Sequence, residues 1–377
     1  MSVRRILVLL VLVAALGTYL YVYEVPQARK EATKAKLLTV DKEAVTGVSL
    51  VYADREIELR KSDTGWRLSK PVDAPADDMA VKGLVSALVD AEVQKTLDQL
   101  PADLAPFGLD KPTVTARLTL KNGEQTPAVA VGKNTAIGGK TYVRKGDEPK
   151  LYLTATTIGY GLSKQAKDLR DKQVIVFQDD DVSRVEIAAE GTDAVVLTRK
   201  DKDAWTVDPG AHPADPTEVR SYLSSLRATR ATDFPDDAPA DLAKYGLDRP
   251  RLTIRIVPAK EGAEPLVLQL GGEGTQGTQK LAYAKRTNQP IVYALGDWTL
   301  RTLTKTAGQL RDKTILGFDP AHVARAEIAR KDGSGATIAR VEGGWQVDGA
   351  GDKKPNADAI THYLDDLRDL RGAEIAA

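Results

Sequence analysis

The sequence predicts an α+β protein with an N-terminal transmembrane helix, tandem duplicated domains of antiparallel strands with amphipathic helices, and a truncated third copy. Two observations carry this prediction. A tryptophan-bearing strand followed by a helix occurs three times, and a series of short alternating strands follows the first two of these helices. The matching segments recur after about 140 residues, which is the size of an autonomous domain and far longer than a solenoid repeat.

The clearest repeated segment begins at a tryptophan and ends in a helix. Each copy pairs a tryptophan with a helix-starting polar residue: Trp66 with Asp77, Trp205 with Asp215, and Trp345 with Asn356. Apolar residues then follow at positions i, i+3, i+4 and i+7, which form one face of a helix. In the first copy they are Val81, Leu84, Val85 and Leu88. Because each tryptophan precedes a core-facing helix, we expect all three rings to be buried and structurally equivalent.

Short strands flank each helix. Residues 45–50 and 55–59 alternate apolar and polar before Trp66, and 182–187 and 195–199 do the same before Trp205. After the helix, a Gly-Leu-Asp-x-Pro turn at 108–112 and again at 246–250 leads into a predicted antiparallel meander. Its strands are expected at 114–120, 128–131, 141–144 and 151–153, and in the second copy at 252–257, 266–270, 281–285 and 291–295.

The domain boundaries follow from the aligned residues Val40, Phe177 and Phe318. They give a transmembrane anchor and flank at 1–30, a first repeat at 38–176, a second at 177–317, and a partial third at 318–377. The third copy keeps the strands and the helix but has no meander. Since terminal units of arrays commonly act as caps, we expect this capping helix to cover the meander of the second copy. The helix of the second copy would cover the first meander in the same way.

Residues 6–23 carry no charge, and their length is at the lower limit for a membrane-spanning helix of about 20 residues. Arg4 and Arg5 precede the segment, and three tyrosines gather at its far end, as at a membrane interface. We therefore predict a single-pass anchor in the bacterial inner membrane. A signal peptide cleaved near residues 13–15 is the alternative. Basic residues on both sides leave the orientation undecided by charge, and the large following domain favours repeats on the extracytoplasmic, periplasmic side.

Composition excludes several classes of function. The chain has 53 basic and 53 acidic residues, so it has no net attraction for nucleic acid, and no nucleic-acid partner is expected. It has no cysteine, which rules out disulfides, thiolate chemistry and a cysteine-linked lipid anchor.

Motifs for catalysis, metals and cofactors are weak. The three histidines occupy unrelated repeat positions, and His362 near Asp365 and Asp366 is best read as a solvated helix face. Residues 272–277 match Gly-x-Gly-x-x-Gly, but a strand follows them where a phosphate-binding motif needs a helix, so a hairpin loop is expected. The acidic run at 179–181 suits a turn. We expect no enzyme activity, no catalytic or metal-binding residues and no cofactor.

A few polar residues recur as candidates for partner binding. Arg170 and Arg311 belong to the repeated Leu-Arg-Asp-Lys segments, where a salt-bridged domain junction is the favoured interpretation. Two matching strands each carry a tyrosine and a basic residue, Tyr142 with Arg144 and Tyr283 with Lys285. If exposed, these side chains form an aromatic and basic strip, whereas strand aromatics more often pack across strands.

The anchor, the Gly-Trp strand, the turn motif at 103–112 and 241–250, and the Leu-Arg-Asp-Lys junction together resemble the bacterial DUF4340 family, over essentially the whole chain after the anchor. The resemblance implies a membrane-anchored accessory role at the cell envelope, because similar proteins are commonly encoded beside subunits of gliding-motility-type ABC transporters. It carries over no catalytic residues. The leading hypothesis is therefore a non-enzymatic extracytoplasmic protein that binds ABC-transporter or envelope subunits. The alternatives are a binding module for glycan or lipid, and an envelope hydrolase with an unrecognised acidic pair.

Overall fold

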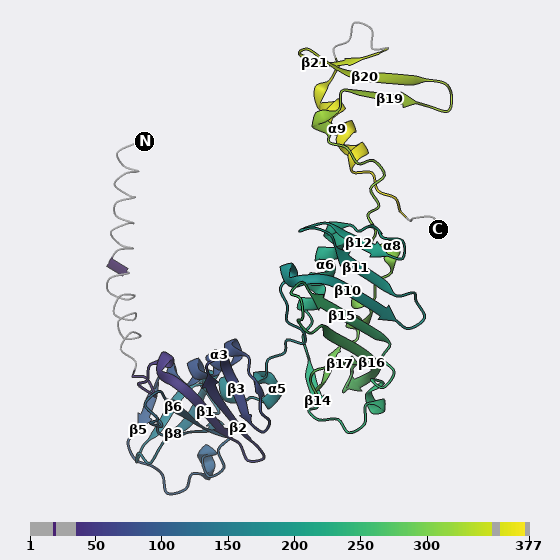
Figure 1. Ribbon diagram of the computed structural model, residues 1–377. Coiled ribbons are helices and arrows are strands. Elements are labelled where there is room, and N and C mark those ends of the chain that lie inside the picture. The colour runs from purple at the N-terminus through teal and green to yellow at the C-terminus, as the bar shows by residue number, and fades with distance from the viewer. Residues whose placement is uncertain (1–17, 20–34, 349–354, 374–377) are drawn as a thin grey trace, which may run out of the picture. The chain divides into compact units, whose positions relative to one another are not determined.

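The computed structural model in Figure 1 describes residues 18–19, 35–348 and 355–373. The chain divides into two compact units, Met1–Lys172 and Gln173–Ala377, and the second unit contains both the second and the third repeat. Apart from Thr18 and Tyr19, the predicted anchor at 6–23 lies outside the described residues. No helix within the described ranges is both long enough and apolar enough to cross a membrane.

The first repeat contains nine strands, three α-helices and two short 3-10 helices. In chain order these are η2 (Lys42–Ala44), β1 (Val45–Val51), β2 (Glu56–Ser62), β3 (Gly65–Lys70), β4 (Ala74–Pro75), α3 (Asp78–Val89), β5 (Lys95–Leu97), η3 (Ala105–Phe107), β6 (Val114–Leu120), β7 (Val129–Asn134), β8 (Lys140–Lys145), β9 (Leu151–Ala155), α4 (Thr157–Leu162) and α5 (Ala166–Leu169).

The second repeat has the same elements in the same order. They are η4 (Asp179–Asp181), β10 (Val182–Ala189), β11 (Val195–Arg199), β12 (Trp205–Asp208), β13 (His212–Pro213), α6 (Pro216–Arg227), β14 (Asp233–Asp236), η5 (Ala243–Tyr245), β15 (Leu252–Pro258), β16 (Leu266–Gln276), β17 (Gln279–Arg286), β18 (Val292–Gly296), α7 (Trp298–Leu303) and α8 (Ala307–Leu310). The predicted duplication is thus present element by element.

Each full repeat forms one continuous antiparallel sheet. The order is β4-β3-β2-β1-β6-β7-β8-β9-β5 in the first repeat and β13-β12-β11-β10-β15-β16-β17-β18-β14 in the second. The strands before the helix and the meander after it are joined where β1 pairs with β6 and β10 with β15. The architecture is therefore α+β with antiparallel sheets, as the sequence predicted.

One face of each sheet carries the core, and the long helix of the same repeat covers it. Val81, Leu84 and Leu88 of α3 pack with sheet residues of the first repeat, and the apolar face of α6 packs with those of the second. Each helix therefore closes its own repeat, and the expectation that the helix of one copy covers the meander of the preceding copy is wrong. The reason is the β1–β6 pairing, which brings each meander under its own helix.

The predicted helix starts are confirmed by their capping bonds. Asp77 accepts a hydrogen bond from the amide of Ala80 at 2.9 Å. Asp215 accepts one from the amide of Thr217 at 2.8 Å, and Asn356 accepts one from that of Ala359 at 3.1 Å. These side chains satisfy amides that the first helical turn leaves without partners.

The Gly-Leu-Asp-x-Pro turn recurs because its glycine lies against a strand of the meander. Gly246 has a φ of +63°, and a Cβ at this position would lie 2.6 Å from the amide nitrogen of Gly272. Gly108 has a φ of +65° and a similar approach to Lys133. Only glycine adopts this conformation at so close an approach without strain. The following leucines, Leu109 and Leu247, are buried.

The boundary between the two units lies between residues 172 and 173, earlier than the predicted boundary at 176 and 177. Val174 and Ile175 are buried in the core of the second repeat. The amide of Val174 donates to the carbonyl of Thr229, just beyond α6. The segment after Lys172 therefore belongs to the second repeat.

The third repeat is a smaller structure built from η6 (Pro320–His322), β19 (Arg325–Ala329), β20 (Gly335–Val341), β21 (Gly344–Val347) and α9 (Ala357–Arg368). Its three strands pair in the order β19-β20-β21. Ile360 and Leu364 of α9 pack with Ile338 in a core of its own. Ile315 and Leu316 are 55% and 41% exposed, whereas their first-repeat counterparts, Leu37 and Leu38, are 2% and 4% exposed.

Burial of the tryptophans also differs between the two full repeats and the third repeat. Trp66 and Trp205 are buried, at 7% and 6% exposure, but Trp345 is only half-buried. The expectation of three equally buried rings is therefore correct for the two full repeats and wrong for the third. Among the described residues the third repeat has no meander to enclose its ring.

We predict that Trp205→Ala lowers the stability of the second repeat by about 3–5 kcal/mol, because it empties a buried aromatic site. Trp345→Ala should lower that of the third repeat much less. Native-state hydrogen exchange, followed on peptides from α6 and α9, separates the two effects. Trp298, which is 56% exposed, provides the control; its replacement should change stability within about 0.5 kcal/mol. Equal losses for Trp205→Ala and Trp345→Ala would contradict the prediction.

Candidate functional site

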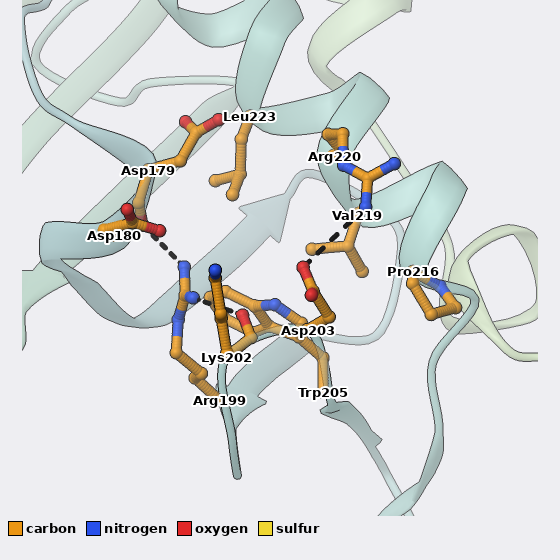
Figure 2. A pocket seen from close by; sticks show the side chains of 10 residues that line it. All are labelled: Asp179, Asp180, Arg199, Lys202, Asp203, Trp205, Pro216, Val219, Arg220 and Leu223. Carbon is orange, nitrogen blue, oxygen red and sulfur yellow. Dashed lines mark hydrogen bonds and ion pairs between the residues drawn. The ribbon is translucent and has the colours of Figure 1, made fainter.

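A hollow lined by charged side chains lies beside Trp205 in the second repeat (Figure 2). Its volume is about 120 Å³. We call it the second-repeat hollow, and its lining residues are Asp179, Asp180, Arg199, Lys202, Asp203, Trp205, Pro216, Val219, Arg220 and Leu223. They come from η4, from the β11–β12 hairpin and from the first two turns of α6. The sequence brings them together because the tryptophan strand, the turn and the helix are packed around one core.

Arg199 lines one side of this hollow (Figure 2). It lies directly across the β11–β12 hairpin from Trp205, and its guanidinium carbon is 4.6 Å from the centre of the indole ring. Its Nε donates to the carbonyl of Val182 at 2.8 Å, and its Nη2 donates to the carbonyl of Asp179. The planar guanidinium thus stacks on an aromatic face and ties the hairpin to the 3-10 turn.

Two other acidic side chains of the second-repeat hollow, Asp203 and Asp179, are ion-paired. Asp203 and Arg220 face one another at 3.7 Å (Figure 2). Asp179 Oδ2 lies 3.2 Å from Nη2 of Arg227, on the following turn of α6. The Oδ1 of Asp179 and the Nε of Arg227 are buried without a hydrogen-bond partner. The lining has three acidic and three basic side chains, so it has no net charge.

The third repeat has the same arginine in the same place. Arg340 lies across the β20–β21 hairpin from Trp345, and its guanidinium carbon is 4.5 Å from the indole centre. Its Nε donates to the carbonyl of Val323 at 3.2 Å, and its Nη2 donates to that of Pro320 at 3.4 Å. The arginine, the tryptophan and the turn therefore form a recurring unit.

The first repeat differs at this position. Lys61 lies across the β2–β3 hairpin from Trp66, and a hollow of about 240 Å³ lies beside them. We call it the first-repeat hollow. The sequence pattern does not indicate either hollow, although a basic residue stands five or six positions before each tryptophan. Only the strand register shows that these basic residues lie opposite the rings.

The tyrosines of the predicted partner-binding strip pack against neighbouring aromatic rings on the face of each sheet opposite the main core. Tyr142 on β8 packs edge-to-face on Phe107, with ring centres 4.9 Å apart, and Tyr283 on β17 packs on Tyr245 at 5.0 Å. Both are half-buried. They hold the 3-10 helix before the Gly-Leu-Asp-x-Pro turn against the meander, which is a packing role for aromatic pairs.

The basic members of the strip lie on the same strands. Arg144 is half-buried and has an ion pair with Asp147 at 3.8 Å, while its Nε is buried without a partner. Lys285 is half-buried on β17. The structure keeps each tyrosine and its basic neighbour on one strand of one repeat, Tyr142 with Arg144 and Tyr283 with Lys285.

Arg170 and Arg311 close the repeats to which they belong. The backbone of Arg170 forms a bridge with Ala76, and that of Arg311 with Ala214, immediately before the long helices. Arg170 is buried, with 4% exposure, and Arg311 is half-buried. The Leu-Arg-Asp-Lys segment thus holds the start of the long helix in place through backbone contacts. In the first repeat, the carbonyl of Leu169 accepts a hydrogen bond from the amide of Asp77.

Asp312 follows Arg311 and links the second and third repeats. Its Oδ1 accepts a hydrogen bond from the amide of Thr314 at 2.9 Å and lies 3.0 Å from Nη1 of Arg371, just beyond α9. Burial acts to raise the pKa of this carboxyl, but the bonds from Thr314 and the charge of Arg371 outweigh it and lower the pKa.

The remaining weak motifs have structural roles. Residues 272–276 of the Gly-x-Gly-x-x-Gly match continue strand β16, and only Gly277 lies in the turn to β17, so the segment is a hairpin as expected but most of it is strand rather than loop. The acidic run at 179–181 forms η4, and His362 lies on α9. Across the part of the chain that the structure describes, no group of three or more His, Asp or Glu side chains is arranged to hold a metal ion.

The fold and these sites define a tandem α+β repeat protein in which each full repeat is a nine-stranded antiparallel sheet covered by helices. The family model for the domain of unknown function DUF4340 matches residues 66–234 and 205–376. The chain therefore belongs to the DUF4340 family. No curated protein and no solved structure matches it. The two matches overlap at 205–234, and each begins at the tryptophan of one full repeat, covers most of that repeat and continues into the next.

The Asp312 contact should make the junction with the third repeat sensitive to acid. A carboxyl whose pKa is lower in the folded protein contributes stability above its unfolded pKa and loses it as the pH falls through the folded value. The contribution should thus be complete at neutral pH and disappear below the ordinary value of 3.8. Protection of the Gly372 amide, which donates to Lys313, reports the change by hydrogen exchange. Asp312→Asn should reduce that protection at pH 7 and remove its dependence on acid; unchanged protection would exclude this role.

Proposed function

We propose that this protein is a non-enzymatic, membrane-anchored accessory protein whose repeats bind other proteins of the cell envelope on the extracytoplasmic side. The observation that carries the proposal is an exposed aromatic side chain on the short helix that follows each meander. Tyr160 on α4 is 72% exposed and Trp298 on α7 is 56% exposed. We propose that each ring is part of an apolar interaction surface, since contiguous exposed apolar patches mark such sites.

The pattern of what recurs supports a binding role. The residues common to both full repeats cap helices, form tight turns or close the helix entry, as Asp215, Gly246 and Arg311 do. The residues that differ between the repeats line the surface hollows. The position of Lys61 in the first repeat is occupied by Arg199 in the second. Repeats that share one fold but carry different surface side chains suit a protein that contacts its partners at several places.

The proposed partner is a subunit of a gliding-motility-type ABC transporter or another envelope protein. Its support is the family resemblance, since similar proteins are commonly encoded beside such transporters. The predicted anchor at 6–23 would hold the repeats at the bilayer. A glycan- or lipid-binding module is the second candidate; Tyr142 and Tyr283, the aromatic residues on which it relies, are half-buried against neighbouring rings.

The topology makes a direct prediction. Protease added to intact spheroplasts should digest the repeats, because the proposal places them outside the cytoplasm. An epitope at the C-terminus and immunoblotting provide the measurement, with a cytoplasmic protein as the control for lysis. Repeats that survive until the cells are opened would show that the extracytoplasmic assignment is wrong.

Site-specific crosslinking tests the partner surface. A photo-crosslinking amino acid at Tyr160 or Trp298 should capture a defined envelope protein in membranes. The same residue at Asp147, whose side chain is fully exposed beyond β8, should capture much less. Mass spectrometry then identifies the captured chain. Equal capture from all three positions would contradict the proposed surface. Hydrolysis of a cell-wall or lipid substrate by the purified protein, lost on replacing one carboxylate, would contradict the non-enzymatic role.

A further inference from the structure

The first-repeat hollow occupies the same place in its repeat as the second-repeat hollow of Figure 2. It lies between η2, the β2–β3 hairpin and α3, as the other lies between η4, the β11–β12 hairpin and α6. Lys61 stands opposite Trp66 as Arg199 stands opposite Trp205. The two hollows therefore have equivalent positions in their repeats but different lining side chains.

Lys61 does not close its hollow as the arginines do. Arg199 and Arg340 stack on their tryptophans and donate to carbonyls of the preceding turn. Among the residues that the structure describes, the Lys61 side chain has no ring contact, hydrogen bond or ion pair comparable to those of the two arginines. An ammonium group lacks the planar fork of donors that such contacts need. The first-repeat hollow is accordingly larger, about 240 Å³ against about 120 Å³.

The charge of the first-repeat hollow is also different. Three lysines line it, Lys42, Lys61 and Lys82, with Glu43 as the only carboxylate. Lys42 is ion-paired with Asp90, outside the lining. Within the described ranges, neither Lys61 nor Lys82 has an ion pair. With Lys42 neutralised by Asp90, Lys61 and Lys82 against Glu43 leave a net charge of +1 in the first-repeat hollow, where the second-repeat hollow is neutral.

The inner wall strengthens any interaction with these lysines. Val45, Trp66 and Val85 line the hollow and are 1%, 7% and 4% exposed, so they belong to the core. An anion held against such a wall loses part of its contact with water, and the attraction of neighbouring charges is screened less. The hydroxyl-bearing Ser86 lies in the same lining. These features together describe an anion site with a short apolar side.

We propose that the first-repeat hollow binds a phosphate group. Lysines bind phosphate as compact point charges, each with several donor hydrogens, and they need no planar partner. The volume admits a phosphate and a few attached atoms rather than a large ligand. The phosphate could belong to a small soluble ester or to a phospholipid headgroup, because the predicted anchor precedes this repeat in the chain. The inference goes beyond the proposed function and does not depend on the identity of the protein partner.

Equilibrium dialysis with labelled inorganic phosphate tests the proposal on the full-length protein in a non-ionic detergent at low ionic strength, where screening is weak. Wild-type protein should bind one phosphate. Lys82→Gln should weaken binding about tenfold, the effect of losing one charge-assisted contact. Lys61→Arg should weaken it as much although the charge is unchanged, because the arginine should stack on Trp66 and fill the hollow. Glu43→Gln should strengthen binding by removing a repelling carboxylate.

Controls and competitors make the test specific. Lys111→Gln removes an exposed lysine of the Gly-Leu-Asp-x-Pro turn, outside the hollow, and should leave binding unchanged. Circular dichroism of each variant checks the fold. Glycerol phosphate and dihexanoyl phosphatidylglycerol, added as competitors, distinguish a soluble ester from a lipid headgroup, and either result supports the shared chemistry.

Three results would overturn the proposal. The first is wild-type protein that binds neither phosphate nor the two competitors. The second is Lys61→Arg protein that is folded and binds as tightly as wild type. The third is Lys111→Gln protein that loses as much affinity as Lys82→Gln. Because dialysis uses purified protein, failure here is distinguishable from failure of the crosslinking experiment.

Discussion

The antiparallel pairing of β1 with β6, and of β10 with β15, is the interaction on which each full repeat depends. It joins residues that are far apart in the chain, such as Val48 with Leu118 and Ile187 with Ile254. Through it, two small sheets become one nine-stranded sheet wide enough to support a long helix and a buried tryptophan. The loop entropy of such a distant closure is offset by the core that forms beneath it.

The third repeat shows what the same elements do without this pairing. It has the hairpins, the capped helix and the arginine stacked on tryptophan. Yet its described strands form a sheet of only three, Trp345 is half-buried, and Ile315 and Leu316 remain exposed. Local structure therefore forms from local sequence, whereas burial of the core depends on the long-range pairing.

A common scaffold also explains how the repeats differ in chemistry. At one cross-strand position arginine stacks on the tryptophan whereas lysine leaves the site open, because the two side chains differ in donor geometry although they share a charge. The difference in net charge between the hollows comes from the other lining residues. The fold tolerates either residue since the position lies at the rim of the core, where Trp66 and Trp205 remain equally buried. Duplication has thus left one architecture with separate surfaces, in accord with a protein that binds partners through several contacts.

The sequence by itself determined the features that depend on neighbouring residues. The duplication, the helix starts at Asp77, Asp215 and Asn356, and the meander strands all follow from periodicity and capping, which act within a few residues. Only the tertiary structure decided which elements meet. It placed each helix on its own sheet, packed Tyr142 and Tyr283 on neighbouring aromatic rings, buried Arg170, and set Lys61 and Arg199 opposite their tryptophans. Strand register and long-range burial decide such contacts, and alternation of apolar and polar residues fixes the face of a side chain without fixing its neighbour.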